Sequence, residues 1–133
     1  MNDNIAYLDS SAFLKLFLAE PESAQLHARL KSFPNQASAM LLRTEVMRAL
    51  RRSGNEYLVG HARRLFRTIH LIRLDELLLD LAGDLEPTGL RSLDAIHLAA
   101  ALSMGSTLSV LFTYDDRLRE AALRQGVEVE SPK

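Results

Sequence analysis

The chain contains no cysteine, no long apolar run and no strong excess of charge of either sign. Without cysteine it can form no disulfide, zinc–thiolate site or thiol nucleophile, so any metal must be bound by oxygen or imidazole. No apolar run approaches the roughly 18 residues that span a bilayer, and the first four residues lack the basic start of a secretory signal. A cytoplasmic protein with no membrane partner is therefore expected.

The formal net charge of −1 is not the polybasic signal that marks many nucleic-acid-binding proteins. The net charge would change if metal were bound. Two divalent ions in an acidic site would add four positive charges and bring the net charge from −1 to +3. The 133 residues contain no repeats, low-complexity tracts or linkers, and 47% of them are hydrophobic. They fit one domain, residues 1–133, that is large enough to bury a core.

The most informative stretch is 93–102, LDAIHLAAAL, in which a single acid, Asp94, enters an otherwise apolar helix. Beyond that acid the only polar side chain is His97, so the helix must be nearly surrounded by protein. Ser92 is expected to be the N-cap, which places Asp94 in the first turn, where the helix dipole favours a carboxylate. Gly105 ends the helix. Taken alone, Asp94 would merely complement the dipole, but three other acids are predicted to meet it.

Short apolar runs alternate with helical patterns along the chain. This alternation predicts an α/β protein, a three-layer α/β/α sandwich with a mainly parallel central sheet. The predicted strands are 5–8, 36–39, 69–74, 110–113 and 127–129. The predicted helices run from residue 12 to Pro21 and then over about 22–31, 40–52, 56–68, 75–81, 93–102 and 118–125.

Four acids are predicted to converge at one end of this sheet. Asp9 and Asp115 each follow an apolar strand, and ligands of such sheets bind outside the carboxyl ends of the strands. Asp94 stands at a helix start, and Glu45 falls inside the apolar arc of helix 40–52. A carboxylate on a core-facing arc needs a partner.

Neighbouring carboxylates repel one another by about 4 kcal/mol per close pair at an effective dielectric near 20. No lysine or arginine of these motifs is clearly aimed inward, so the missing counter-charge is best supplied by Mg²⁺ or Mn²⁺, which prefer carboxylate oxygens. Such an ion can orient and deprotonate water and stabilise a departing oxygen. The predicted chemistry is phosphodiester hydrolysis.

Four motifs in this order resemble those of the PIN domain family, and most closely the VapC-type toxins of bacterial and archaeal toxin–antitoxin pairs. The motifs are YLDSSA at 7–12, RTEV at 43–46, SLDAIHLA at 92–99 and FTYDDRL at 112–118. The resemblance implies a Mg²⁺- or Mn²⁺-dependent endoribonuclease with an α/β/α sandwich. It also implies an RNA substrate, a homodimer and inhibition by a cognate antitoxin.

The resemblance also assigns roles to particular residues. It makes a metal-binding catalytic quartet of Asp9, Glu45, Asp94 and Asp115. Ser10 and Thr113 match positions whose hydroxyls orient the acids. Asp116 either joins them in that role or caps the last long helix, and the cap is the favoured interpretation.

Several other residues have two interpretations. His97 lies one turn from Asp94 and could be a ligand, but a hydrogen-bonded core histidine is favoured because hard cations prefer oxygen. Phe13, Phe17 and Phe66 fit core stripes better than base-stacking platforms. A run of arginines on two adjacent predicted helices either follows an RNA backbone or is simply a solvated surface. Its members are Arg43, Arg48, Arg51, Arg52, Arg63, Arg64 and Arg67.

Two alternative functions stay open at the level of sequence. In a different metal-dependent phosphoryl enzyme, or a receiver-type switch, Asp9 would accept a phosphoryl group. The DSS motif, however, lacks the second Asp two residues on that a haloacid-dehalogenase-like phosphatase has. The other alternative is a non-catalytic PIN-fold interaction module, against which the complete quartet argues.

Overall fold

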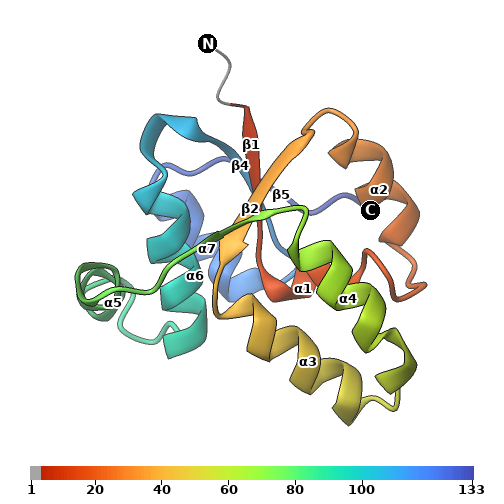
Figure 1. Ribbon diagram of the computed structural model, residues 1–133. Coiled ribbons are helices and arrows are strands. Elements are labelled where there is room, and N and C mark those ends of the chain that lie inside the picture. Colours follow the sequence, from red (N-terminus) through yellow and green to blue (C-terminus); the bar gives the residue numbers. More distant parts are fainter. Residues whose placement is uncertain (1–3) are drawn as a thin grey trace.

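The computed structural model describes residues 4–133, and its centre is a parallel sheet of five strands in the order β3-β2-β1-β4-β5 (Figure 1). The strands are β1 (Ile5–Leu8), β2 (Asn35–Ala39), β3 (His70–Ile72), β4 (Leu108–Phe112) and β5 (Val129–Glu130). The α-helices are α1 (Ser10–Leu14), α2 (Ser23–Leu30), α3 (Leu42–Arg52), α4 (Val59–Phe66), α5 (Glu76–Gly83), α6 (Ser92–Ser103) and α7 (Asp116–Arg124). Short 3₁₀ turns at Glu56–Leu58 and Gly105–Thr107 precede α4 and β4.

Both faces of the sheet are covered by helices, as the sequence predicts. Successive side chains of a strand point to opposite faces. Ala6 and Leu8 of β1 accordingly pack with α1 and α2, whereas Tyr7 packs with α5, α6 and α7. The three-layer α/β/α expectation is therefore confirmed.

A further apolar cluster joins α1 to the pair α3 and α4, which lie together at the lower right of Figure 1. The rings of Phe13 and Phe66 stack in it with their centroids 5.6 Å apart, and Phe17 meets Phe13 edge-on at the same distance. Phe13 and Phe66 are buried and Phe17 is partly buried against them. All three aromatics belong to the core, as predicted.

Several element ends differ from the predictions. Helix α1 stops at Leu14 although the apolar pattern continues, and the last strand is Val129–Glu130 instead of 127–129. Ser92 is the first residue of α6 and not its N-cap, because the extended residue before it is Arg91, whose side chain makes no capping hydrogen bond. Gly105 follows the helix with a φ of 58°, the left-handed conformation that glycine adopts most readily.

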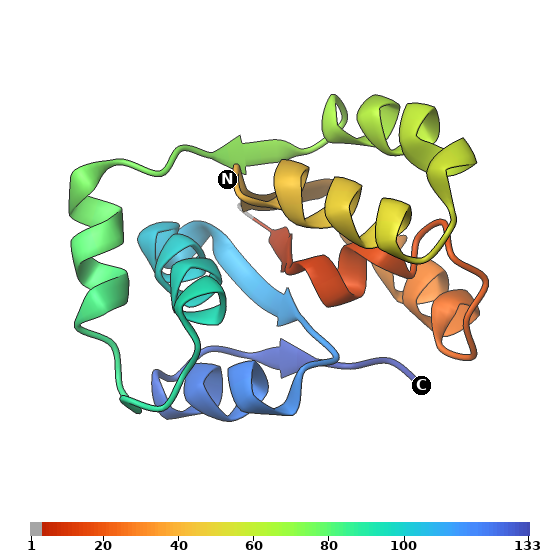
Figure 2. The same ribbon diagram turned by 90° about the horizontal axis from the view of Figure 1, so that it is seen from below.

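The strand register determines what meets at the carboxyl edge of the sheet. Leu8 pairs with Phe112, so the residues that follow, Asp9 and Thr113, become neighbours. Helices α1, α3 and α7 begin just beyond β1, β2 and β4. Figure 2, which looks at the molecule from below, shows them around the same end as the start of α6. Within residues 4–133 no helix is both long and apolar enough to cross a membrane.

Candidate active site

Asp9 is the most deeply buried of the predicted site acids, with 3% of its surface exposed. It caps α1: Oδ1 accepts the backbone N–H of Ala12 at 2.9 Å and the hydroxyl of Ser11 at 2.7 Å. Oδ2 accepts the hydroxyl of Thr113 at 2.5 Å. Burial raises the pKa of Asp9, whereas His97 and these donors act in the opposite direction. The carboxylate is thus held in one orientation from two elements.

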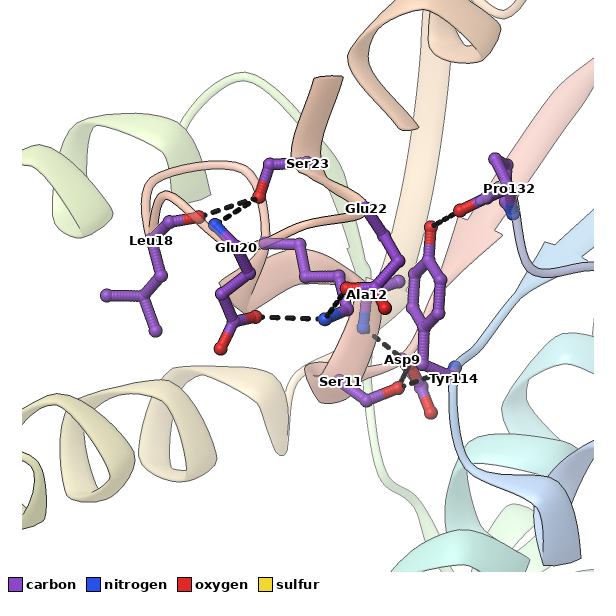
Figure 3. A network of polar contacts seen from close by, with 10 residues as sticks. Asp9, Ser11, Ala12, Leu18, Glu20, Glu22, Ser23, Tyr114 and Pro132 are labelled. Atoms are coloured by element: carbon purple, nitrogen blue, oxygen red, sulfur yellow. Dashed lines mark hydrogen bonds and ion pairs between the residues drawn. The ribbon is translucent and has the colours of Figure 1, made fainter. Parts of the chain in front are cut away.

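The serine that orients Asp9 is Ser11 and not the predicted Ser10. Figure 3 shows the Ser11 hydroxyl between Asp9 and the backbone of Tyr114, whose N–H it accepts at 2.9 Å. In the part of the chain that the structure describes, Ser10 makes no hydrogen bond to an acid and instead lines a groove beside Glu45. The two adjacent serines look alike in sequence, and only the pairing of β1 with β4 selects the second.

Asp115, and not Asp116, caps α7. Its Oδ1 accepts the backbone N–H groups of Arg117 and Leu118 at 2.9 and 3.1 Å, whereas Asp116 is an exposed residue of the first turn. The predicted assignment of the cap to Asp116 is therefore wrong. Thr113 helps to decide it, because its hydroxyl oxygen accepts the Asp115 N–H at 3.0 Å while its proton goes to Asp9. One threonine thus joins two of the acids, as predicted for an orienting hydroxyl.

Glu45 lies in the first turn of α3 and receives its partner from α6. Its Oε1 is 2.6 Å from Nε2 of His97, and Nδ1 of that ring is 2.7 Å from the hydroxyl of Tyr7. His97 and Tyr7 are buried, with 1% and 0% of their surfaces exposed. The favoured interpretation of His97 as a hydrogen-bonded core histidine is confirmed. Its partner is Glu45, the core-facing carboxylate for which the sequence predicts a partner.

Asp94 is half-buried, and the causes of its pKa shift indicate which other acids lie near it. Burial raises its pKa most, and the negative charges of Asp115 and Asp9 raise it further. His97 acts in the opposite direction, and Glu45 adds to the increase. Asp9, Glu45 and Asp115, from three other elements, therefore all lie close enough to Asp94 to act on it.

All four acids stand at the N-terminal ends of helices. Asp9 and Asp115 are N-caps, and Glu45 and Asp94 lie in the first turns of α3 and α6. Unsatisfied N–H groups and the helix dipole make such ends favourable for negative charge. This arrangement helps the fold to tolerate four neighbouring acids, although burial, and then the charges of the other acids, still raise the pKa of Asp94.

The donors suit a hard divalent ion in an open site. Among residues 4–133, no three Asp, Glu or His side chains form a ready-made metal cage. Mg²⁺ keeps several of its waters and typically needs only one or two protein carboxylates in direct contact. Oδ2 of Asp115 and Oε2 of Glu45 make no hydrogen bond within the described chain, and Oδ2 of Asp9 makes one. Each of these carboxylates can therefore still offer an oxygen.

A basic groove runs from Glu45 along α3. An opening of about 440 Å³ is lined by Glu45, Arg48 and Arg52, and a second of about 320 Å³ shares Arg48 and continues past Arg63. The ion pairs of lysine or arginine in the described chain join Lys15 to Glu20 and Glu22, and Arg29 to Glu130. The groove arginines are exposed. None of them forms an ion pair with a carboxylate within residues 4–133.

Comparison with known proteins identifies the family of this chain. The sequence profile described as "PIN domain" matches residues 6–123. Ribonuclease VapC46 of Mycobacterium tuberculosis is 48% identical over 126 residues, which cover 95% of this chain and 96% of that protein. Ribonuclease VapC47 of the same species is 38% identical over 130 residues with the same coverage.

A solved toxin–antitoxin complex from Klebsiella pneumoniae contains a chain of the same fold. That chain superposes with a TM-score of 0.73 and 22% identity over 96% of this chain and 98% of its own length. The profile match and the sequence identity to two ribonucleases together establish the family of this chain. The chain belongs to the PIN domain family, in its VapC-type branch.

Proposed function

We propose that this protein is a Mg²⁺- or Mn²⁺-dependent endoribonuclease, the toxin of a toxin–antitoxin pair, with Asp9, Glu45, Asp94 and Asp115 as its metal-binding catalytic acids. The observation that carries the proposal is the meeting of the acids at one edge of the sheet, where the Thr113 hydroxyl bonds both the Asp9 carboxylate and the Asp115 N–H. Asp94 lies beside them: burial raises its pKa most, and the charges of Asp115, Asp9 and Glu45 raise it further. A divalent ion bound there would supply the missing counter-charge, activate water and stabilise the departing oxygen. The 48% identity to a protein named a ribonuclease supports the RNA substrate.

The residues of this chain would orient the reaction. Asp9 is held through both oxygens and so presents a fixed charge at the centre of the site. Asp115 uses one oxygen for the α7 cap, which leaves the other free to face the ion. The same constraints weigh against a covalent phosphoryl intermediate on Asp9, because a buried carboxylate with three donors is a poor nucleophile.

The basic groove supports a polymeric phosphate substrate. Arg48 and Arg52 lie one helical turn apart on α3, in line with Glu45, so a bound backbone would be directed toward the acids. Arginines of this kind supply affinity through phosphate contacts without selecting a sequence. Between the two interpretations of the arginine run, the absence of carboxylate partners within residues 4–133 favours RNA binding.

The test is cleavage of RNA by the purified protein in Mg²⁺ or Mn²⁺, in EDTA, and with Asp94→Asn. The parent should cleave only with a divalent ion, and Asp94→Asn should lose at least about 100-fold in rate because one of the charges that hold the ion is removed. Asp116→Asn is the matched control, because this acid is the exposed neighbour of Asp115 and the proposal gives it no role. Cleavage by Asp94→Asn at the parental rate would contradict the metal mechanism and favour a non-catalytic module.

The proposal includes two protein partners. The Klebsiella pneumoniae neighbour is part of a toxin–antitoxin complex, which supports a cognate antitoxin for this chain. A homodimer is supported by exposed leucines on one helix: Leu77 of α5 is 70% exposed, and Leu79 and Leu81 are 42% and 48% exposed. The molar mass in solution, measured by light scattering, distinguishes dimer from monomer. The cytoplasmic location stays a prediction from the sequence.

A further inference from the structure

A buried chain of hydrogen bonds leads from Glu45 into the core. It joins α3, α6 and β1 through Glu45 Oε1, the two ring nitrogens of His97 and the Tyr7 hydroxyl, with distances of 2.6 and 2.7 Å. The chain of hydrogen bonds ends at Tyr7; Ser38 of β2 is a further buried hydroxyl, and it has no hydrogen-bond partner in the described chain. These polar groups are otherwise surrounded by the apolar cluster of α5, α6 and α7.

The direction of each hydrogen bond follows from the chemistry of its partners. An ionised carboxylate only accepts, so Nε2 of His97 must carry the proton that it shares with Glu45. In the neutral ring Nδ1 then has a lone pair and accepts the Tyr7 hydroxyl proton. The Tyr7 phenol has a hydroxyl proton to donate, and its oxygen lies 2.7 Å from Nδ1. Tyr7 therefore selects the ring tautomer that Glu45 needs.

Glu45 has no comparable restraint from its own helix. The N-cap position of α3 is Leu41, which makes no side-chain capping bond, and 15% of the Glu45 side chain is exposed. A free glutamate side chain loses rotamer entropy when it is fixed, which costs free energy. The His97 hydrogen bond meets this cost in the folded protein, before anything binds, and leaves Oε2 without a hydrogen bond within residues 4–133.

We infer that His97, oriented by Tyr7, is a positioning residue that fixes Oε1 of Glu45 so that Oε2 faces the metal and substrate. This inference rests on the proposed function, because it assigns a role within the same site. Hydrogen-bond partners of metal ligands typically contribute 10- to 100-fold in metal affinity. Both ring nitrogens are occupied by Glu45 and Tyr7, so the ring acts through Glu45.

The test measures Mn²⁺ affinity by calorimetry in variants of the whole chain. His97→Leu removes the donor and should weaken Mn²⁺ binding about 10-fold or more, whereas His97→Gln, whose amide can still donate, should stay within about 3-fold of the parent. Tyr7→Phe preserves ring packing and removes only the hydroxyl, so it should weaken binding about 3- to 10-fold. Ser103→Ala is the control, because this serine lies at the other end of α6 and its hydroxyl donates to the Ala100 carbonyl, its one partner among residues 4–133.

A second measurement reads the tautomer directly. Nitrogen NMR of the imidazole should show the proton of the neutral ring on Nε2 in the parent, and a mixture of tautomers in Tyr7→Phe. A protonated Nδ1 and bare Nε2 in the neutral ring of the parent, or unchanged Mn²⁺ affinity in folded Tyr7→Phe and His97→Leu, would overturn the inference. If the parent itself neither binds Mn²⁺ nor cleaves RNA, the proposed function fails instead. The two failures are therefore distinguishable.

Discussion

At the residue scale, the raised pKa values of Asp9 and Asp94 mean that these two acids, when ionised, lower the free energy of unfolding of the metal-free protein. A carboxyl whose pKa is higher in the folded chain than in the unfolded chain favours folding while it is protonated, and this contribution is lost as the pH rises through the folded pKa. Asp9 and Asp94 both have pKa values raised above 3.8, so the metal-free protein should lose stability from about pH 4 upward. The positive helix end at Asp94 reduces this loss without reversing it.

Asp94→Asn should therefore stabilise the metal-free protein at pH 7. We expect a gain of about 0.5 to 1 kcal/mol in the free energy of unfolding, kept small because a half-exposed carboxylate is screened by solvent. The measurement is thermal unfolding in EDTA, where the midpoint should rise by about 2 to 4 °C. Added Mn²⁺ should stabilise the parent and leave the variant unchanged, because an ion stabilises only the folded state that binds it. Asp116→Asn should show neither effect, and a destabilised Asp94→Asn would contradict the electrostatic account.

The residues that sequence reasoning placed correctly are those defined by local pattern. Asp9 and Asp115 follow apolar strands, and Thr113 closes one, so their position at the sheet edge was predictable. The choices between Ser10 and Ser11, and between Asp115 and Asp116, were not predictable, because each pair has the same local propensity. Contacts across the β1–β4 pairing decide both choices.

His97 was predictable in part. Glu45 was recognised as a carboxylate that needed a partner, and His97 as the one polar side chain of a buried helix. If the two buried polar groups are assumed to be each other's partners, the sequence predicts the contact between Glu45 and His97. Tyr7 gave no such signal, because within an apolar strand it looks like any other core residue.

At the element scale, the alternation of strands and helices was enough to predict the layers and the parallel sheet, since each pattern reflects which faces are buried. The ends of elements were less predictable. Thr113 pairs with Glu130 of β5, and this non-local contact shifts the last strand from 127–129 to Val129–Glu130. Asp115 has two functions, one as the N-cap of α7 and one in the proposed metal site. Different substitutions can separate them.

Asp115→Asn should keep the cap and lose catalysis, whereas Asp115→Ala should lose both. Asparagine caps a helix about as well as aspartate, but alanine costs about 1 kcal/mol. Urea unfolding in EDTA measures the first property and RNA cleavage the second. Asp75 is the matched control, because it caps α5 through Leu78 in the same way. Asp75→Ala should destabilise by a similar amount and still cleave RNA, and full activity in Asp115→Asn would show that this carboxylate acts only as a cap.

At the scale of the whole molecule, charge is divided between an acidic sheet edge and the arginines of α3 and α4, which the net charge of −1 conceals. Under the proposed function the two regions cooperate: the acids with their ion cut the chain that the arginines hold. Electrostatic contacts with phosphates have a distinctive signature, since log K falls with log salt concentration by about 0.7 for each single-stranded phosphate neutralised. This slope separates phosphate contacts from any general loss of folding.

The double variant Arg48→Gln, Arg52→Gln should reduce the salt slope of RNA binding by about 1 to 1.5 and weaken binding similarly for unrelated RNA sequences. Affinity is measured by fluorescence anisotropy over a salt series, in an Asp94→Asn background so that the RNA survives. Arg124→Gln is the control, because it removes an arginine at the far end of α7 from the Asp115 cap and should leave the slope unchanged. An unaltered slope in the double variant would identify the groove as solvated surface, whereas intact RNA binding with lost antitoxin binding would assign it to the protein partner.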